Sequence, residues 1–145
     1  MHVNIKRLDK DLPLPKYETD GSVGFDILAR EDTVVGARGL ALIPGNIVVE
    51  VPKGYMLLVA SRSSTPRKKG LLTPHGIGII DHDYCGPEDE VKIQVHNFTD
   101  EDVKVERGER IAQGLFVRID KFAWEENEEM NNKNRGGFGS TDNKQ

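Results

Sequence analysis

The sequence lacks a second cysteine and a long hydrophobic run, and each absence restricts what the protein can be. Cys85 has no second cysteine with which to form a disulfide within the chain, so nothing points to an oxidising compartment. Residues 1–7 lack the apolar segment of a signal peptide, and no apolar run approaches the roughly 20 residues that span a bilayer. We therefore expect a soluble cytoplasmic protein with no membrane partner.

An excess of basic charge is also absent. The 20 lysines and arginines are outnumbered by 24 aspartates and glutamates, which gives a formal net charge of −4. This balance gives no general electrostatic reason to bind nucleic acid, and we predict no nucleic-acid partner. Locally, Arg62 and residues 67–69 form a basic cluster that could contact a small anion such as a phosphate chain. For residues 67–69 a solvated basic loop is an alternative that stays open.

The sequence also lacks an amphipathic helix of useful length. Its 145 residues suit one domain, and glycine and proline separate its short apolar segments throughout. Strand signals fall at residues 3–8, 24–29, 40–43, 46–51, 55–60, 77–80, 91–95, 102–105 and 111–119. Residues 63–69 allow one short helical turn, which Pro66 limits. The pattern predicts an all-β sandwich or jelly-roll fold over residues 1–124, followed by a mobile polar C-terminal arm at 125–145.

Residues 76–86 contain an apolar run that stops abruptly at a carboxylate. The isoleucines within positions 77–80 are typical of a buried strand, and Asp81 follows them directly. We predict that this strand pairs with residues 91–95 in a hairpin that has Asp81 and Tyr84 near its mouth. A carboxylate between a covered strand and an open loop is well placed to act as a base. The alternative, which this stretch alone favours, is that Asp81 only caps a turn.

Three other segments carry polar groups that a β-sheet core does not need. Asp26 interrupts an apolar strand, and a buried carboxylate requires either an ion-pair partner such as Arg110 or a metal shell. Gln113 lies among apolar neighbours, so its amide must be hydrogen-bonded, either as a structural bridge or to a ligand. Residues 61–64 begin a short helical turn whose hydroxyls and N–H groups suit a phosphate oxygen. Helix capping by one of the serines is the alternative there.

Residues 135–141 differ in character from the polar tail around them. Arg135 offers a two-pronged guanidinium, and Phe138 offers a flat apolar face that can stack on a base. The three glycines of this segment let the backbone approach a ligand closely, and its serine and threonine supply hydroxyls. A flexible polar tail is the alternative, and it fits residues 142–145 better than it fits residues 135–141.

Taken together, these segments resemble the five ordered motifs of the trimeric dUTP diphosphatases (dUTPases). The motifs lie in the same order and at similar intervals, at residues 24–27, 61–64, 78–86, 107–113 and 135–141. The resemblance implies the jelly-roll-like β-clip fold of that family, assembled as a homotrimer with active sites at the subunit interfaces. It also implies a reaction, the Mg²⁺-dependent hydrolysis of dUTP to dUMP and pyrophosphate, which limits uracil in DNA and supplies dUMP for thymidylate synthesis.

The resemblance implies a role for individual residues as well. Asp81 would activate the water that attacks the α-phosphorus, and Tyr84 would pack under the deoxyribose and leave no room for a 2′-hydroxyl. Asp26 would reach the Mg²⁺ ion through water. The residues that would contact the substrate are Arg62, Ser63, Ser64, His75, Gly78, Ile80, Tyr84, Gln113, Arg135, Phe138, Gly139 and Ser140.

Three positions depart from the family pattern. His75 stands where the family often has an asparagine in the base pocket, Ser61 replaces a proline, and the segment between Arg135 and Phe138 is shorter than usual. A histidine can still donate one N–H, but its contact with the base differs from that of an amide. The long polar linker before Arg135 could compensate for the shorter motif.

Two other functions are compatible with the same fold. The related dCTP deaminases, including bifunctional enzymes that also hydrolyse dUTP, use a glutamate as a base where this sequence has Gln94. An amide cannot take up that proton. A non-enzymatic module that senses nucleotides or binds a protein would be expected to lack Asp81 or Tyr84, and both are present. Hydrolysis of dUTP is therefore the function that the sequence predicts.

Overall fold

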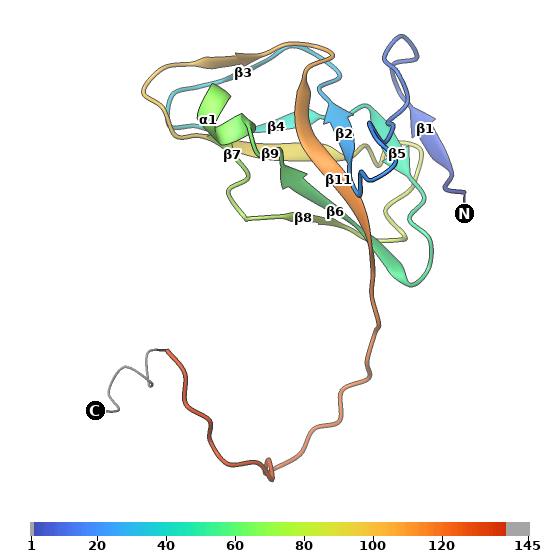
Figure 1. Cartoon of the computed structure of the whole chain (residues 1–145), viewed down its shortest axis with the longest axis vertical. Helices are drawn as coiled ribbons and strands as arrows, with labels where there is room; N and C mark the ends of the chain where they lie inside the picture. The colour runs from blue at the N-terminus through green and yellow to red at the C-terminus, as the bar shows by residue number, and fades with distance from the viewer. Residues whose placement is uncertain (1, 139–145) are drawn as a thin grey trace.

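The fold is built almost wholly from β-strands, as the sequence predicts (Figure 1). The computed structural model describes residues 2–138, and within that range it has eleven strands and one helix. These elements are β1 (Ile5–Arg7), β2 (Phe25–Leu28), β3 (Thr33–Val35), β4 (Leu40–Pro44), β5 (Ile47–Val49), β6 (Tyr55–Ser61), α1 (Thr65–Lys69), β7 (Leu71–Leu72), β8 (Gly78–Ile80), β9 (Lys92–Asn97), β10 (Val103–Val105) and β11 (Arg110–Arg118).

Two antiparallel sheets form the body of the molecule. β2, β11, β6 and β8 form the larger sheet in that order, and β4, β9 and β7 form the smaller one. β1 pairs with β5, and β3 pairs with β10, in two-stranded ribbons. β11 runs between β2 and β6, so its register with both strands fixes which of their residues end up side by side.

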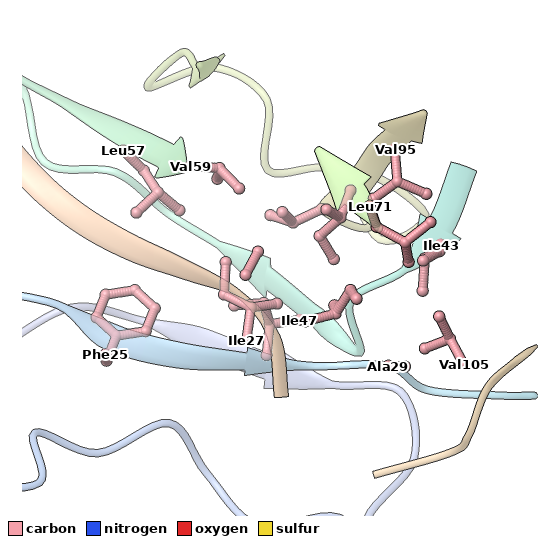
Figure 2. Close-up of a cluster of buried hydrophobic side chains, with 14 of the residues drawn as sticks. Phe25, Ile27, Ala29, Ile43, Ile47, Leu57, Val59, Leu71, Val95 and Val105 are labelled. Carbon is pink, nitrogen blue, oxygen red and sulfur yellow. The ribbon is translucent and has the colours of Figure 1, made fainter. Parts of the chain in front are cut away.

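The hydrophobic core is formed by side chains from both sheets (Figure 2). Ile27 and Leu57 come from the larger sheet, Ile43 and Leu71 come from the smaller one, and none of the four is more than 1% exposed. Burying one such side chain contributes roughly 1.5–3 kcal/mol. This core holds the two sheets together and thereby fixes the strand ends that carry the polar groups.

Gly114 allows β2 and β11 to pack closely. A Cβ atom at this position would lie 2.7 Å from the ring of Phe25, which is buried, and 3.2 Å from Leu57. No side chain fits in that space, so a glycine is needed at this point of β11. Phe25 in turn packs against Phe116, with ring centroids 5.8 Å apart.

The helical turn predicted at residues 63–69 is present as α1. Pro66 lies in the first turn, where a missing N–H costs nothing, and Gly70 ends the helix with a φ of +66°. The N–H of Gly70 donates to the carbonyl of Pro66 at 2.9 Å. The basic residues 67–69 occupy the last turn, where positive charge suits the helix dipole.

The predicted hairpin between residues 77–80 and 91–95 is wrong. β8 pairs with β6, whereas β9 pairs with β4 and β7, so the two strands belong to different sheets. The eleven residues 81–91 connect the sheets and are too long for a tight hairpin loop, which usually has two to five residues. This connection contains its own turn, in which Asp89 accepts a hydrogen bond from the N–H of Gly86 at 2.7 Å.

The burial predicted for residues 77–80 is also wrong for the isolated chain. β8 is the outer strand of the larger sheet, and Ile77 and Ile79 are 40% and 57% exposed. An apolar run identifies a strand but does not distinguish a central strand from an edge strand. Two strands were not predicted: β3, which lies in a polar stretch, and β7, which has only two residues.

The chain leaves the β-body after β11. Residues 119–138 form no strand or helix, and Figure 1 shows them running away from the sheets. Phe122 and Trp124 are 81% and 98% exposed on this segment. The predicted boundary between a domain at 1–124 and an arm at 125–145 stays a prediction. Within the described residues, no helix is long and apolar enough to cross a membrane.

Candidate active site

Asp26 on β2 pairs with two arginines. Its Oδ1 lies 2.7 Å from Nε of Arg62, and its Oδ2 lies 3.4 Å from Nε of Arg110. The predicted pair of Asp26 with Arg110 is therefore confirmed, and Arg62 adds a shorter contact. Because the side chain of Asp26 is only 18% exposed, these partners offset the cost of removing its charge from water. The pairing also fixes the direction of Arg62 at the end of β6.

The serines after Arg62 present their hydroxyls at the start of α1. Ser64 occupies the N-cap position of the helix, but its hydroxyl makes no capping hydrogen bond. The capping alternative is therefore wrong for Ser64. Ser63, one residue earlier, is exposed. These hydroxyls lie in a turn beside a guanidinium, which is an arrangement that suits phosphate oxygens.

Ser61 replaces the proline of the family pattern and makes a specific contact. Its hydroxyl lies 2.8 Å from that of Thr73, and it accepts the N–H of Thr73 at 3.1 Å. The end of β6 is thereby tied to the loop that precedes β8. A proline would restrict the backbone but would lack this hydroxyl. With Ser61 the chain loses that restriction and gains a side-chain hydrogen bond to Thr73.

Gln113 is a structural bridge in this chain. It lies opposite Asp26 in the register of β11 with β2, and its Nε2 donates to the carbonyl of Ser61 at 3.0 Å. An amide has a second N–H and a carbonyl oxygen, so this bond does not exhaust its capacity. We call Asp26, Arg62, Ser63, Ser64 and Gln113 the β6-end cluster.

His75 and Gly78 come together at the start of β8. A Cβ on Gly78 would lie 3.3 Å from Cβ of Val59 and 3.8 Å from Nε2 of His75, so the imidazole lies beside the Gly78 backbone. Gly76 makes the approach possible with a φ of +80°, and its N–H donates to Thr73 at 3.1 Å. The histidine predicted in the base pocket is thus held close to the backbone predicted to read the base.

Asp81 and Tyr84 lie in the loop after β8. The backbone N–H of Tyr84 donates to the carbonyl of Asp81 at 3.3 Å, so the main chain and not the carboxylate closes this turn. Asp81 is exposed, and its carboxylate has no hydrogen bond or ion pair with the described residues. The turn-capping alternative is therefore wrong for its side chain. We call His75, Gly78, Ile80, Asp81 and Tyr84 the β8 cluster.

The two clusters are far apart within one chain. β8 runs antiparallel to β6, with Gly78 opposite Val59 and Ile80 opposite Leu57. Leu57 is five residues before Arg62, which corresponds to roughly 17 Å of extended strand. Asp81 lies beyond Ile80 in the direction away from Arg62. Asp81 of one chain therefore cannot act on a phosphate bound at the β6-end cluster of the same chain.

The sequence analysis missed two residues that support the β8 cluster, Glu90 and Arg30. Their side chains form a two-pronged ion pair, with Nε to Oε1 at 2.8 Å and Nη2 to Oε2 at 3.1 Å. The bond to Glu90 raises the pKa of Arg30 above its ordinary value. The one available signal was a carboxylate directly before Val91, a buried residue that precedes β9.

The fourth predicted motif, at residues 107–113, is attached to the N-terminal segment by an ion pair. Nε and Nη2 of Arg107 lie 2.8 and 2.7 Å from Oδ2 of Asp9. The side-chain hydrogen bond from Arg107 lowers the pKa of the Asp9 carboxyl. This contact fixes the turn that leads into β11 and hence the register of Gln113.

The predicted arm residues lie apart from both clusters. Arg135 and Phe138 are exposed on the segment that runs away from the body (Figure 1). The predicted Gly139 and Ser140 lie outside the described residues. Within one chain, the residues of the β6-end cluster lie together and those of the β8 cluster lie together, but the two clusters are separate. Arg135 and Phe138 are exposed and belong to neither.

The residues around Asp26 fit a metal ion only through water. Each oxygen of the carboxylate faces an arginine, but a carboxylate has about four lone-pair sites, so each oxygen can accept one more hydrogen bond. No group of three or more side chains that could hold a metal occurs within residues 2–138. Mg²⁺ keeps several waters and binds phosphate oxygens of the substrate. These residues therefore fit an ion that a triphosphate carries, with water between the ion and Asp26.

The hydroxyl, guanidinium and amide groups of the β6-end cluster can bind phosphate oxygens. The exposed carboxylate of Asp81 can take a proton from water. The class of protein that needs both is a hydrolase acting on a phosphorylated substrate. A family model described as dUTPase matches residues 10–142 of this chain. The chain belongs to the dUTPase family.

Individual relatives agree with the family match. The deoxyuridine 5′-triphosphate nucleotidohydrolase of Lactococcus lactis subsp. lactis (strain IL1403) is 40% identical over 131 residues, which cover 88% of this chain and 87% of that protein. The dUTPase from Streptococcus mutans has a TM-score of 0.76 and 33% identity over 83% of this chain and 98% of its own. A mutant dUTPase of Staphylococcus bacteriophage 80alpha, solved with dUpNHpp, has a TM-score of 0.85 and 25% identity over 97% and 98%.

Proposed function

We propose that this dUTPase hydrolyses dUTP to dUMP and pyrophosphate by attack of water on the α-phosphorus, in active sites shared between subunits of a homotrimer. The observation that carries the proposal is the carboxylate of Asp81, which is unpaired within residues 2–138 and follows an edge strand in a member of this family. The matched relative from Lactococcus lactis is named for this reaction, and the phage 80alpha enzyme binds dUpNHpp. Removal of dUTP limits uracil in DNA, and dUMP is the precursor of dTMP.

Asp81 acts as the general base. A carboxylate with no partner among residues 2–138 is available to accept a proton from the attacking water. The water then attacks in line with the leaving pyrophosphate, and positioning with charge stabilisation supplies most of the acceleration. The proton passes from the water to the carboxylate, and the broken bond is the one between the α-phosphorus and the bridging oxygen.

The β6-end cluster binds the triphosphate. Ser63 and Ser64 donate their hydroxyls, and Gln113 donates the N–H that its bond to Ser61 leaves unused. Arg62 uses Nε for Asp26 and keeps its terminal N–H groups for phosphate oxygens. When bound, Mg²⁺ would neutralise part of the charge on the triphosphate, and Asp26 would hold the ion through one of its waters.

The β8 cluster selects the base and the sugar. β8 pairs only with β6 among the strands of the described chain, so the other edge of its backbone can hydrogen-bond to uracil. Gly78 and Ile80 supply this edge, and His75 lies beside it. The ring of Tyr84 packs under the deoxyribose and leaves no space for a 2′-hydroxyl.

The distance between the two clusters supports sharing of each site between subunits. A triphosphate at the β6-end cluster needs a base within hydrogen-bonding reach, and Asp81 of the same chain is too far away. A second copy can bring its β8 cluster to the β6-end cluster of the first. Cyclic symmetry then repeats the site at every interface, and the arm of a third copy closes it.

Truncation after residue 134 tests the role of the arm. It removes Arg135 and Phe138, which we propose to contact the terminal phosphate and the uracil. We expect kcat for dUTP to fall by about 100-fold or more, because charge stabilisation and exclusion of water are lost. Light scattering should give the same oligomer as the full chain, since no strand of the body is removed. An unchanged kcat would mean that the arm takes no part in the site.

Incubation of the protein with each of dUTP, dCTP, dTTP and UTP tests the reaction itself. We expect Mg²⁺-dependent release of dUMP and pyrophosphate from dUTP and little turnover of the other three, with products resolved by chromatography. Production of dUTP from dCTP would instead identify a deaminase. Gln94, opposite Leu42 in the smaller sheet, argues against that outcome because an amide cannot serve as the base.

A further inference from the structure

Glu90 is the one buried residue with an ionisable side chain among residues 2–138. Its side chain is 5% exposed and lies just before β9, at the end of the loop that carries Asp81 and Tyr84. A charge removed from water is kept only when its partners are well placed. Such a residue in a loop beside a site suggests that its position matters to the site.

Two parts of the chain that are distant in sequence contact the carboxylate of Glu90. Arg30, which follows β2, contacts both oxygens, at 2.8 and 3.1 Å. The backbone N–H of Asn46, between β4 and β5, donates to Oε1 at 2.8 Å. The amide of Asn46 is itself fixed, because its Nδ2 donates to the carbonyl of Asp9 at 3.1 Å and its Oδ1 accepts the Asp9 N–H at 2.7 Å. The carboxylate of Glu90 is thus held from two sides, by Arg30 and by Asn46, and Asp9 fixes the side chain of Asn46.

The main chain of Glu90 holds Tyr84. The phenolic hydroxyl of Tyr84 donates to the carbonyl of Glu90 at 3.2 Å, across six residues of loop. The ring is 38% exposed, and the loop around it contains no strand or helix. The next residue is also fixed, since the N–H of Val91 donates to Ile47 at 2.8 Å. The carbonyl of Glu90 is therefore a fixed point to which the far end of the tyrosine is attached.

We infer that Glu90 and Arg30 are positioning residues for Tyr84 and thereby determine how strongly the enzyme prefers deoxyribose to ribose. The inference rests on the proposed function, in which the ring of Tyr84 excludes the 2′-hydroxyl. A ring that is fixed at both ends excludes one oxygen atom by contact. A ring whose anchor shifts can move aside and admit the ribonucleotide.

Glu90→Gln tests this, because it keeps the shape and the bond from Asn46 but removes the charge that pairs with Arg30. We expect the ratio of kcat/KM for dUTP to kcat/KM for UTP to fall by about tenfold or more, with a smaller change for dUTP itself. Arg30→Lys, which keeps the charge but loses the two-pronged contact, should shift the ratio in the same direction. It carries the test if Glu90→Gln does not fold.

Asp100→Asn is the matched control. It removes the carboxylate from another arginine pair, in which Nε of Arg38 lies 2.8 Å from Asp100, on a surface remote from Tyr84 in the chain. In Asp100→Asn the ratio of kcat/KM for dUTP to kcat/KM for UTP should equal that of the wild type. A purely structural role for Glu90 would lower stability or kcat for both nucleotides equally and leave the ratio unchanged.

Tyr84→Phe completes the experiment. In this background Glu90→Gln should cause no further fall in the ratio, because the hydroxyl that it anchors is gone. An unchanged ratio in Glu90→Gln and Arg30→Lys, or an additive fall with Tyr84→Phe, would overturn the inference while the proposed function stands. A wild-type protein that hydrolyses UTP as well as dUTP would overturn the proposed role of Tyr84 itself.

Discussion

Replacing Asp81 by asparagine lowers kcat for dUTP by about a thousandfold or more, while the affinity for a non-hydrolysable dUTP analogue stays within a few-fold of the wild type. The amide keeps the size and shape of the side chain, which has no hydrogen bond or ion pair to lose within the part of the chain that the structure describes. It cannot accept the proton of the attacking water, and general base catalysis contributes about 10²–10⁴-fold. Initial rates of pyrophosphate release and calorimetric titration with the analogue measure the two quantities separately.

Glu88→Gln is the control for Asp81→Asn. It removes one negative charge from the same loop, on an exposed side chain that we assign no role. Its kcat should stay near the wild-type value. Turnover by Asp81→Asn within a few-fold of the wild type would exclude Asp81 as the base, and equal losses in the two variants would point to the net charge of the loop.

Mixing two inactive variants restores activity if each site is shared between chains. Asp81→Asn removes the base from the β8 cluster, and Ser63→Glu places a carboxylate on an exposed turn where the triphosphate must bind. Co-expressed at equal levels, the two chains form mixed oligomers in which about a quarter of the sites take both halves from intact clusters. The expected activity is therefore about a quarter of the wild-type activity per site, measured on oligomers purified from the mixture.

A chain that carries both substitutions, co-expressed with the wild type, is the matched control. Shared sites again leave about a quarter of them intact, whereas sites formed within one chain would leave about half. Sites within one chain would also give no activity in the first mixture. The pair of mixtures therefore separates the two arrangements without a structure of the oligomer.

Most strands of this fold were predictable because each is marked by a pattern of residues that are adjacent in the sequence. β5 lies within the segment predicted at 46–51, where β-branched residues gather, and β11 overlaps the segment predicted at 111–119 but begins one residue earlier, at Arg110. The pairing of the strands was not predictable in the same way. The loop from Asp81 to Val91 connects two sheets, and its eleven residues contain no signal that says which strand β8 will join.

The candidate site was predictable in its parts but not in its contacts. The order of the five motifs singled out Asp26, Arg62 and Gln113, which the structure brings together at the end of β6. The pairing of Arg30 with Glu90 joins residues 60 positions apart. No periodicity links residues at that separation, so neither residue stood out in the sequence. Long-range ion pairs depend on the topology, which local patterns do not determine.

The segment after β11 acts as a tether with an entropic cost. Sixteen residues separate Arg118 from Arg135, which allows a reach of up to roughly 55 Å. A tethered group has an effective concentration in the millimolar range, so an arm that closes the site as we propose needs only weak contacts to occupy it for much of the time. Doubling the tether would cost only about 0.6 kcal/mol. Residues 119–134 can therefore vary in sequence and length far more freely than the strands, provided that they remain long enough to span the gap.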